Sequence, residues 1–171
     1  MFAFTHLISA WLLGKGYEFI WKKKISHLAW FFLLFGSLFS DADFLIDWTF
    51  GTEIHRTFTH SLLFLAVAPL LLYFTLTLLK WEQKKSCSYA LAVGIASHLL
   101  LDMIMSRGVP LFWPSLINIS FTQIGYFDPQ TPSFLHASAN ALQKVLKVAI
   151  FDMALGTTWI FYFWYKKRIQ F

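Results

Sequence analysis

The chain contains apolar stretches long enough to cross a bilayer, and these limit what it can fold into. The four clear stretches are Ile25–Ser40, Phe58–Leu79, Cys87–Met105 and Val148–Tyr165. In the second, the Leu, Val and Phe residues alone favour insertion by about 4 to 8 kcal/mol. Over all 171 residues, 57% are hydrophobic and 13% charged, whereas a soluble domain has about a quarter charged residues. We therefore expect an all-α, polytopic membrane helical bundle and exclude a water-soluble or disordered protein.

A fifth apolar stretch opens the chain. Phe2–Gly14 continues to Trp21 with few interruptions, and as a helix it would be about 30 Å long, enough to span. The prediction is a single membrane-embedded domain, 1–171, of about five helices, with an outer segment at about 106–147. In that segment Ile117, Ile119 and Phe121 alternate with polar residues, which predicts a short strand. Ser133–Lys147 has the pattern of an amphipathic helix.

The lysines and arginines stand at the ends of the apolar stretches. With five crossings, ten of the 14 fall on one side of the membrane: Lys15, Lys22, Lys23, Lys24, Lys80, Lys84, Lys85, Lys166, Lys167 and Arg168. Cytoplasmic loops carry such an excess, so we expect the N-terminus outside and the C-terminus in the cytoplasm. The net charge of +5 then reflects membrane topology, and no nucleic-acid partner is predicted.

Acidic and imidazole side chains from distant segments are predicted to meet at the outer face. They are His6, Asp41, Asp43, Asp47, His55, His60, His98 and Asp102, with Arg56 and Arg107 at the same level. Imidazole nitrogens and carboxylate oxygens are ligands of Zn²⁺ and related ions. His98 and Asp102 are four residues apart, so on a helix they share one face. A cation between them would offset the cost of burying Asp102.

Four blocks of this sequence resemble the YdjM-type, LexA-regulated, membrane-bound metal-dependent hydrolases of bacteria. They are Thr5-His6, Gly36–Asp43 (GSLFSDAD), His55–Leu62 (HRTFTHSL) and Ser97–Pro114 (SHLLLDMIMSRGVPLFWP). The family usually has Pro before the first Asp of its D-x-D pair, where this chain has Ser40. The resemblance implies a multi-pass protein of the bacterial inner membrane that hydrolyses its substrate with the help of a metal ion.

The pattern is also similar to that of zinc-dependent bacterial phospholipases C, which use an early His, an Asp, a His and a helical HxxxD. The metal ligands that we predict are His6, Asp41, His60, His98 and Asp102, and on that analogy Asp102 could bridge two ions. We expect one or two divalent ions, Zn²⁺ first, with Mn²⁺ or Mg²⁺ as alternatives. Asp43 would orient a ligand, bridge or act as general base, and His55 and Arg56 would bind or protonate the leaving group. Arg56 and Arg107 are the predicted substrate-binding residues, and the substrate would be a lipid or polyprenyl phosphoester at the outer face.

Each of these features also has a simpler explanation. The HxxxD pair could be a structural hydrogen bond, and the aspartates after Ser40 could form a solvated loop. Thr57 or Thr59 could cap a helix with His60 on its surface, and the arginines could anchor lipid headgroups. Asp152 either completes the site or pairs with Lys144 or Lys147, and we expect pairing. The alternative functions are a metal-ion transporter, or a non-catalytic membrane protein whose polar cluster holds helices together.

Overall fold

The computed structural model describes residues 3–52, 54, 57–104, 108–115, 117–121, 124–126 and 139–166. Its helices are α1 (Ala3–Trp21), α2 (His27–Phe39), α3 (Asp43–Phe50), α4 (Leu62–Leu78), α5 (Lys84–Ile104) and α6 (Ala139–Tyr165). Two 3-10 turns, Ser40–Ala42 and Phe58–His60, and two short strands, β1 (Ile117–Ile119) and β2 (Ile124–Tyr126), complete the described elements. The all-α membrane fold predicted from the sequence is confirmed.

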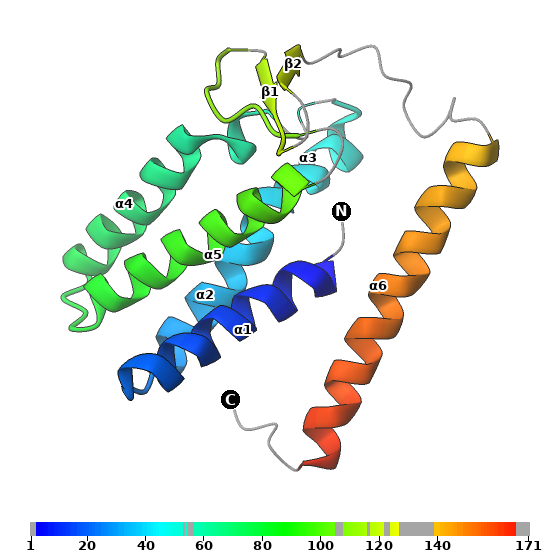
Figure 1. The fold of residues 1–171 in the computed structure, drawn as a ribbon. Helices are drawn as coiled ribbons and strands as arrows, with labels where there is room; N and C mark the ends of the chain where they lie inside the picture. Colours follow the sequence, from blue (N-terminus) through cyan, green and yellow to red (C-terminus); the bar gives the residue numbers. More distant parts are fainter. Residues whose placement is uncertain are drawn as a thin grey trace.

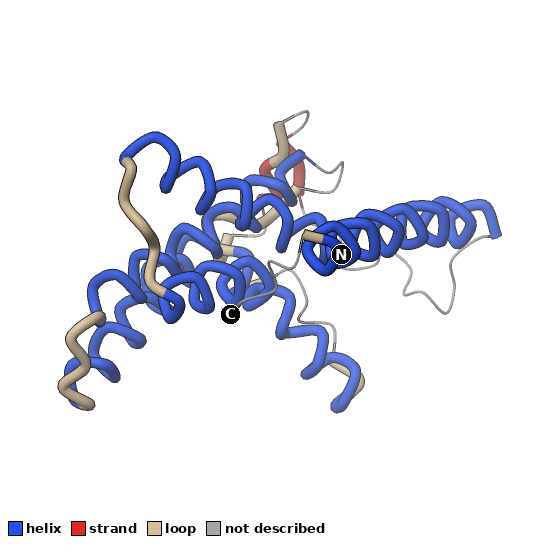
Figure 2. The backbone as a smooth tube through the Cα atoms, turned by 90° about the horizontal axis from the view of Figure 1, so that it is seen from below, coloured by secondary structure: helices blue, strands red, loops and turns tan. Residues whose placement is uncertain are grey.

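Helix α5 lies at the centre of the bundle (Figure 1). It packs against α1, α2 and α4, and its contact with α2 is the most extensive between any two described elements. Half of the α5 span is buried inside the protein, against 11% of the span in α6. Helix α6 lies beside α1 and extends away from the other helices (Figure 2). Most side chains of Leu146–Tyr165 in α6 therefore face the surroundings of the protein, as expected for a helix in contact with lipid.

Among the described residues, three helices are long and apolar enough to cross a membrane: His27–Phe50, Lys84–Ile104 and Leu146–Tyr165. The first joins α2 and α3 through the turn Ser40–Ala42, so the helical path does not end at Ser40 as predicted. It ends at Gly51, which takes the left-handed conformation with a φ of 66°. The aspartates after Ser40 thus lie in helical turns, where their backbone positions are fixed, and not in a solvated loop.

The apolar stretch from Phe58 is not one continuous helix. Its first residues form a 3-10 turn, Ser61 is extended, and α4 follows as a shorter apolar helix of 17 residues. The hydroxyl of Ser61 accepts a hydrogen bond from the Phe64 amide at 3.1 Å, which caps α4. Because the chain changes direction at Ser61, His60 is fully buried and does not lie on the outer surface of a helix.

Helices α2 and α5 approach closely where two glycines meet. A Cβ atom on Gly94 would lie 2.3 Å from the Leu33 carbonyl oxygen, and one on Gly36 would lie 2.6 Å from the Leu91 carbonyl oxygen. These are backbone atoms, which cannot move aside as a flexible side chain could. The glycines therefore set the distance between the two helices, as small residues do in other membrane bundles.

The described residues that follow α5, with the hairpin of β1 and β2, lie at one end of the bundle (Figure 1). Strands β1 and β2 are antiparallel, with Ile117 opposite Tyr126, and β1 includes two of the residues whose alternation predicted a strand. The segment is tied to the helices by backbone hydrogen bonds from Leu62 to Leu111 and from Phe121 to Met103, both 2.9 Å. The last span was predicted to begin at Val148, after a separate amphipathic helix at Ser133–Lys147. Residues 139–147 are instead the first part of α6, and residues 133–138 lie outside the described residues.

The close approach of α2 and α5 at their glycines predicts that Gly→Ala substitutions at two positions change the stability of the protein differently. Gly94→Ala should lower the free energy of unfolding by about 1 to 3 kcal/mol, because the added methyl group collides with the α2 backbone. Gly16→Ala in α1 meets no atom within 4 Å and should be neutral or stabilise by about 0.5 to 1 kcal/mol. Unfolding of both variants in detergent measures the difference, and equal stability would contradict the close packing.

Candidate metal centre

Four side chains from different elements converge at the end of the bundle that the hairpin covers. Asp41 lies in the first 3-10 turn, His60 in the second, and His98 and Asp102 lie one turn apart near the end of α5. Each contributes one ligand atom, and these atoms all lie within 4.8 Å of one another. Three of the four residues are buried, so a group of charged and polar side chains has been removed from both lipid and water.

The ring of His98 is oriented by the backbone of α2. Its Nδ1 lies 2.7 Å from the Ser37 carbonyl oxygen. Because a carbonyl only accepts hydrogen bonds, Nδ1 must carry the proton and donate it. In the neutral ring, Nε2 is then an unprotonated acceptor, and it faces the other three residues.

The ring of His60 is oriented in the same way by two side chains. The Thr59 hydroxyl donates a hydrogen bond to Asp43 Oδ2, so its oxygen accepts from His60 Nδ1 at 3.1 Å. Asp43 Oδ2 itself lies 3.7 Å from the same ring nitrogen. Acceptors behind an imidazole fix its tautomer and raise its basicity as a ligand, an arrangement found around metal-bound histidines. In the neutral form, His60 also presents a bare Nε2 to the centre.

Most of the separations between these atoms are those of ligands around one ion. His60 Nε2 lies 3.4 Å from Asp41 Oδ1 and 3.5 Å from Asp102 Oδ2. His98 Nε2 lies 3.5 Å and 3.8 Å from the same two oxygens, and the two Nε2 atoms are 3.3 Å apart. Ligands on a tetrahedral zinc ion stand about 3.3 to 3.6 Å apart for bonds of about 2.0 to 2.2 Å. Direct hydrogen bonds are shorter, typically about 2.7 to 3.2 Å, so the donor set fits a cation better than a simple hydrogen-bonded cluster.

His6 lies next to this group but faces a different atom. From the end of the first turn of α1, its Nε2 is 3.4 Å from Asp102 Oδ1, while Asp102 Oδ2 faces the two other histidines. Its ring stacks on that of His98, with centroids 4.0 Å apart and planes inclined by 18°. The two oxygens of Asp102 thus join His6 to the other predicted ligands.

The remaining predicted residues occupy different places. Asp43 is 2% exposed and lies behind His60, so it is positioned to orient a ligand. Asp47 accepts hydrogen bonds from the Thr52 hydroxyl at 2.7 Å and the Ile54 amide at 2.8 Å, and it holds the turn after α3. His55, Arg56 and Arg107 lie outside the described residues.

Two contributions to the site had no specific signal in the sequence. The Ser37 carbonyl is a backbone group, which residue type cannot reveal. The sequence favours Thr59 only as a helix cap, and its position next to His60 is the one signal for a partner of that ring. Asp41 is the most exposed of the four residues: its side chain is 15% exposed, against 2% or less for His60, His98 and Asp102.

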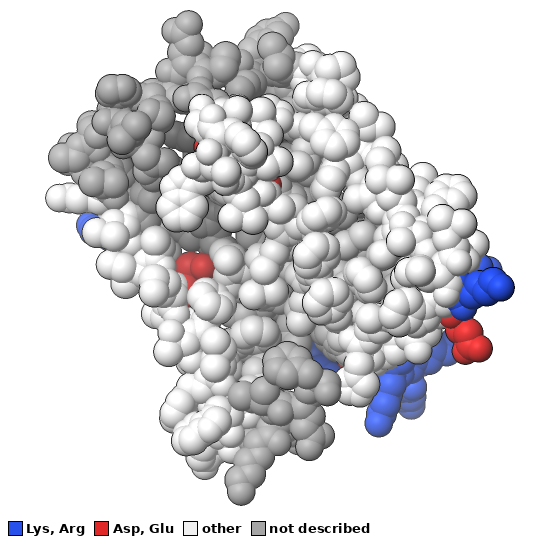
Figure 3. All heavy atoms as spheres, turned by 180° about the vertical axis from the view of Figure 1, so that it is seen from behind, with Lys and Arg blue, Asp and Glu red and all other residues white. Residues whose placement is uncertain are grey.

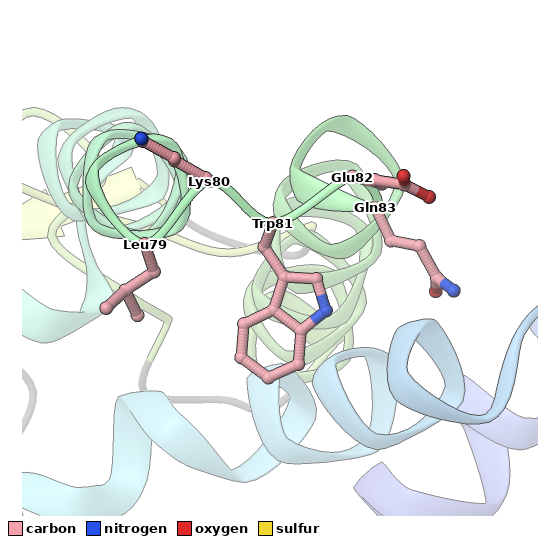
Figure 4. A pocket seen from close by; sticks show the side chains of 5 residues that line it. All are labelled: Leu79, Lys80, Trp81, Glu82 and Gln83. Carbon is pink, nitrogen blue, oxygen red and sulfur yellow. The ribbon is translucent and has the colours of Figure 1, made fainter.

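The opposite end of the bundle has a different character. The lysine and arginine side chains seen in Figure 3 gather largely at one end, where Lys22 follows α1 and Lys80 follows α4. An open hollow lies there, lined by the turn Leu79, Lys80, Trp81, Glu82 and Gln83 (Figure 4). It contains none of the clustered histidines or aspartates. The described lysines of the α1–α2 and α4–α5 connections and the candidate metal centre thus occupy opposite ends of the helices.

Comparisons with known proteins place the chain in a family. The family model described as "YdjM inner membrane protein" matches residues 1–169. The "Uncharacterized protein YvsG" of Bacillus subtilis (strain 168) is 38% identical over 79 residues, which are 44% of this chain and 46% of that protein. The "Inner membrane protein YdjM" of Escherichia coli (strain K12) is 44% identical over 61 residues, 35% of this chain and 30% of that protein. No solved structure gives a significant match.

The matched regions span less than half the length of these curated relatives. The family model, in contrast, covers nearly the whole chain, including the candidate metal centre and α6. That match agrees with the long apolar helices and with the resemblance seen in the sequence blocks. The chain belongs to the YdjM inner membrane protein family.

Proposed function

We propose that this chain is a membrane-bound, metal-dependent hydrolase that acts on a lipid or polyprenyl phosphoester at the outer face of the membrane. The observation that carries the proposal is the convergence of Asp41, His60, His98 and Asp102 on one point. A divalent cation held there, Zn²⁺ first among the candidates, would act as a Lewis acid and lower the pKa of a bound water. His6 is proposed as a further ligand through its position at the second oxygen of Asp102.

The chain's own residues would divide the remaining work. Asp43 and Thr59 keep the proton on His60 Nδ1, and the Ser37 carbonyl does the same for His98. Asp41 is the most accessible member of the centre, so the substrate would approach from its side. His55 and Arg56, which precede His60 in the chain, would bind or protonate the leaving group. Arg107, after α5, would bind the phosphate, since its guanidinium can donate two parallel hydrogen bonds.

Exposed aromatic residues near the centre support a membrane-embedded substrate. On α3, which follows Asp41, Trp48 is 89% exposed and Phe50 is 75% exposed. On the outer segment, Phe112 and Phe121 are at least 60% exposed. Trp and Tyr side chains, such as Trp48 here, are enriched at the level of lipid headgroups, which is the depth at which a lipid carries its phosphate. A site at this depth suits an amphiphilic phosphoester.

The location of the buried histidines and aspartates favours a local metal site over a path for transport across the membrane. Among the described residues, the buried histidines and aspartates are His6, Asp43, His60, His98, Asp102 and Asp152. All of them belong to the centre, support it or contact the start of α1. A transporter needs polar groups through both halves of the bilayer, and at the basic end of the described bundle no histidine, aspartate, glutamate, lysine or arginine is buried.

Metal content tests the centre directly. The protein purified in detergent should retain a divalent ion, measured by elemental analysis, and the double variant His98→Ala, Asp102→Ala should lose at least nine tenths of it because two ligands are gone. His27→Ala is the matched control, since His27 is exposed and begins α2 far from the centre. Full metal loading of the double variant would remove the proposal.

The carboxylate behind His60 provides a second test. Asp43→Asn should weaken metal binding by about 10- to 100-fold, as loss of such supporting groups typically does. Asp47→Asn, on the same helix, changes a carboxylate that accepts hydrogen bonds from the turn after α3 and should leave affinity unchanged. Competition with a chelator measures both affinities, and equal values for the two variants would show that Asp43 does not support the centre.

Activity tests the reaction itself. Phospholipids and polyprenyl phosphates in detergent micelles should release their products when the protein is metal-loaded. Chelator should stop the reaction, added Zn²⁺ should restore it, and His60→Ala should reduce the rate by at least 100-fold. A metal-loaded protein that hydrolyses none of these substrates, but carries the ion into liposomes, would support the transporter in place of the hydrolase.

A further inference from the structure

Helix α6 contains one buried acidic residue in an otherwise largely exposed helix. Asp152 is 6% exposed, and its carboxylate contacts the first turn of α1. Oδ1 accepts hydrogen bonds from the Thr5 amide at 2.8 Å and the Thr5 hydroxyl at 2.6 Å, and Oδ2 accepts from the Phe4 amide at 3.1 Å. The sequence predicts that Asp152 pairs with Lys144 or Lys147, with completion of the site as the alternative, and it contains no signal for this contact between opposite ends of the chain.

The contact has a clear physical basis. The first amide groups of a helix have no acceptor within the helix, and the positive end of the helix dipole favours a nearby anion. Asp152 supplies an acceptor for two of these amides and a negative charge at the same place. Hydrogen bonds to a charged acceptor are stronger than neutral ones, and burial of the carboxylate reduces competition from water.

Packing on the same face of α6 strengthens this attachment. Gly156 lies one turn after Asp152, and a Cβ atom there would lie 2.2 Å from the ring of Phe4. Further along, Trp159 and Phe163 make edge contacts with Trp11, at centroid distances of 6.0 Å and 5.2 Å. The spacing of four, three and four residues places all of these side chains on one face of α6. Helix α6 is therefore fixed against α1 at the end that carries His6.

His6 depends on this attachment more than the other histidines do. His98 and His60 each have an acceptor at Nδ1 that fixes the ring. The Nδ1 atom of His6 is buried and has no hydrogen-bond partner among the described residues. The place of its ring is thus determined by the backbone of α1 together with the stack on His98, and Thr5, which directly precedes His6, is held by Asp152.

We propose that Asp152 is a positioning residue, which holds the start of α1 so that His6 Nε2 stays at Asp102 Oδ1. The inference rests on the metal centre of the proposed function, and it makes α6 a part of that centre although α6 carries none of the proposed ligands. Asp152 acts indirectly: its carboxylate fixes the backbone amides of Phe4 and Thr5, and these residues fix the position of His6, which follows them in α1.

Titration of the detergent-purified protein with Co²⁺, followed by visible absorption, tests the proposal. Asp152→Asn should weaken Co²⁺ binding by about 10-fold or more and shift the spectrum towards that of His6→Ala. In a His6→Ala background, Asp152→Asn should cause no further change, since both act through one ligand. Thr5→Val, which removes one of the three hydrogen bonds and keeps the shape of the side chain, should have a smaller effect in the same direction. The matched control is Thr157→Val, because this exposed hydroxyl bonds only within α6.

The outcomes separate the possible failures. A purely structural role for Asp152 would lower the unfolding midpoint but leave the Co²⁺ affinity and spectrum unchanged, and this would overturn the inference. If Asp152→Asn does not fold, the Thr5→Val variant provides the test. A Co²⁺ affinity and spectrum equal to those of the wild type would then overturn the inference. A wild-type protein that binds no Co²⁺ or Zn²⁺ would overturn the metal centre of the proposed function, and this inference with it.

Discussion

The fold depends on the partners that compensate the charged and polar side chains buried inside this membrane protein. An ionised carboxylate without a partner is costly in a medium of low dielectric constant, and this chain buries several at one end of the bundle. Each described one contacts an imidazole, a hydroxyl or a helix N-terminus. Because these partners come from different helices, compensation requires the helices to meet in one arrangement. The groups proposed to bind the ion therefore also constrain the fold.

The contact between α2 and α5 shows how packing and chemistry are joined. Gly36 and Gly94 allow the two backbones to approach, and one turn further along α5 the Ser37 carbonyl reaches His98. A larger separation of the helices would break this hydrogen bond and leave the tautomer of the ring undefined. Helix α6 makes a comparable connection to the start of α1, where the Asp152 carboxylate accepts hydrogen bonds from the Phe4 and Thr5 amides. Two of the proposed ligands, His98 and His6, are thus positioned through backbone groups of α2 and α1.

Several features of the site could be predicted from local sequence, and others could not. The HxxxD spacing on a helix places His98 and Asp102 on one face, because the helical repeat is known. Apolar periodicity could not reveal that the chain breaks at Ser61, since the residues on both sides are compatible with one long span. That break turns His60 inwards, and the continuation of α2 through a 3-10 turn gives Asp41 its place. Neither could Asp152 be paired with Thr5, because 147 residues separate them and their contact depends on how α6 packs.

The sequence by itself determined that this chain is a membrane bundle, because the free energy of transferring long apolar stretches into lipid depends mainly on composition and length. It also determined which residue types could bind a cation, since ligand chemistry belongs to the side chain. Only the tertiary structure decided which of these side chains meet, which atom of each faces the others, and which ring nitrogen carries the proton. Those properties depend on distances of a few ångströms between helices, and such distances are set by packing at glycines and by backbone hydrogen bonds.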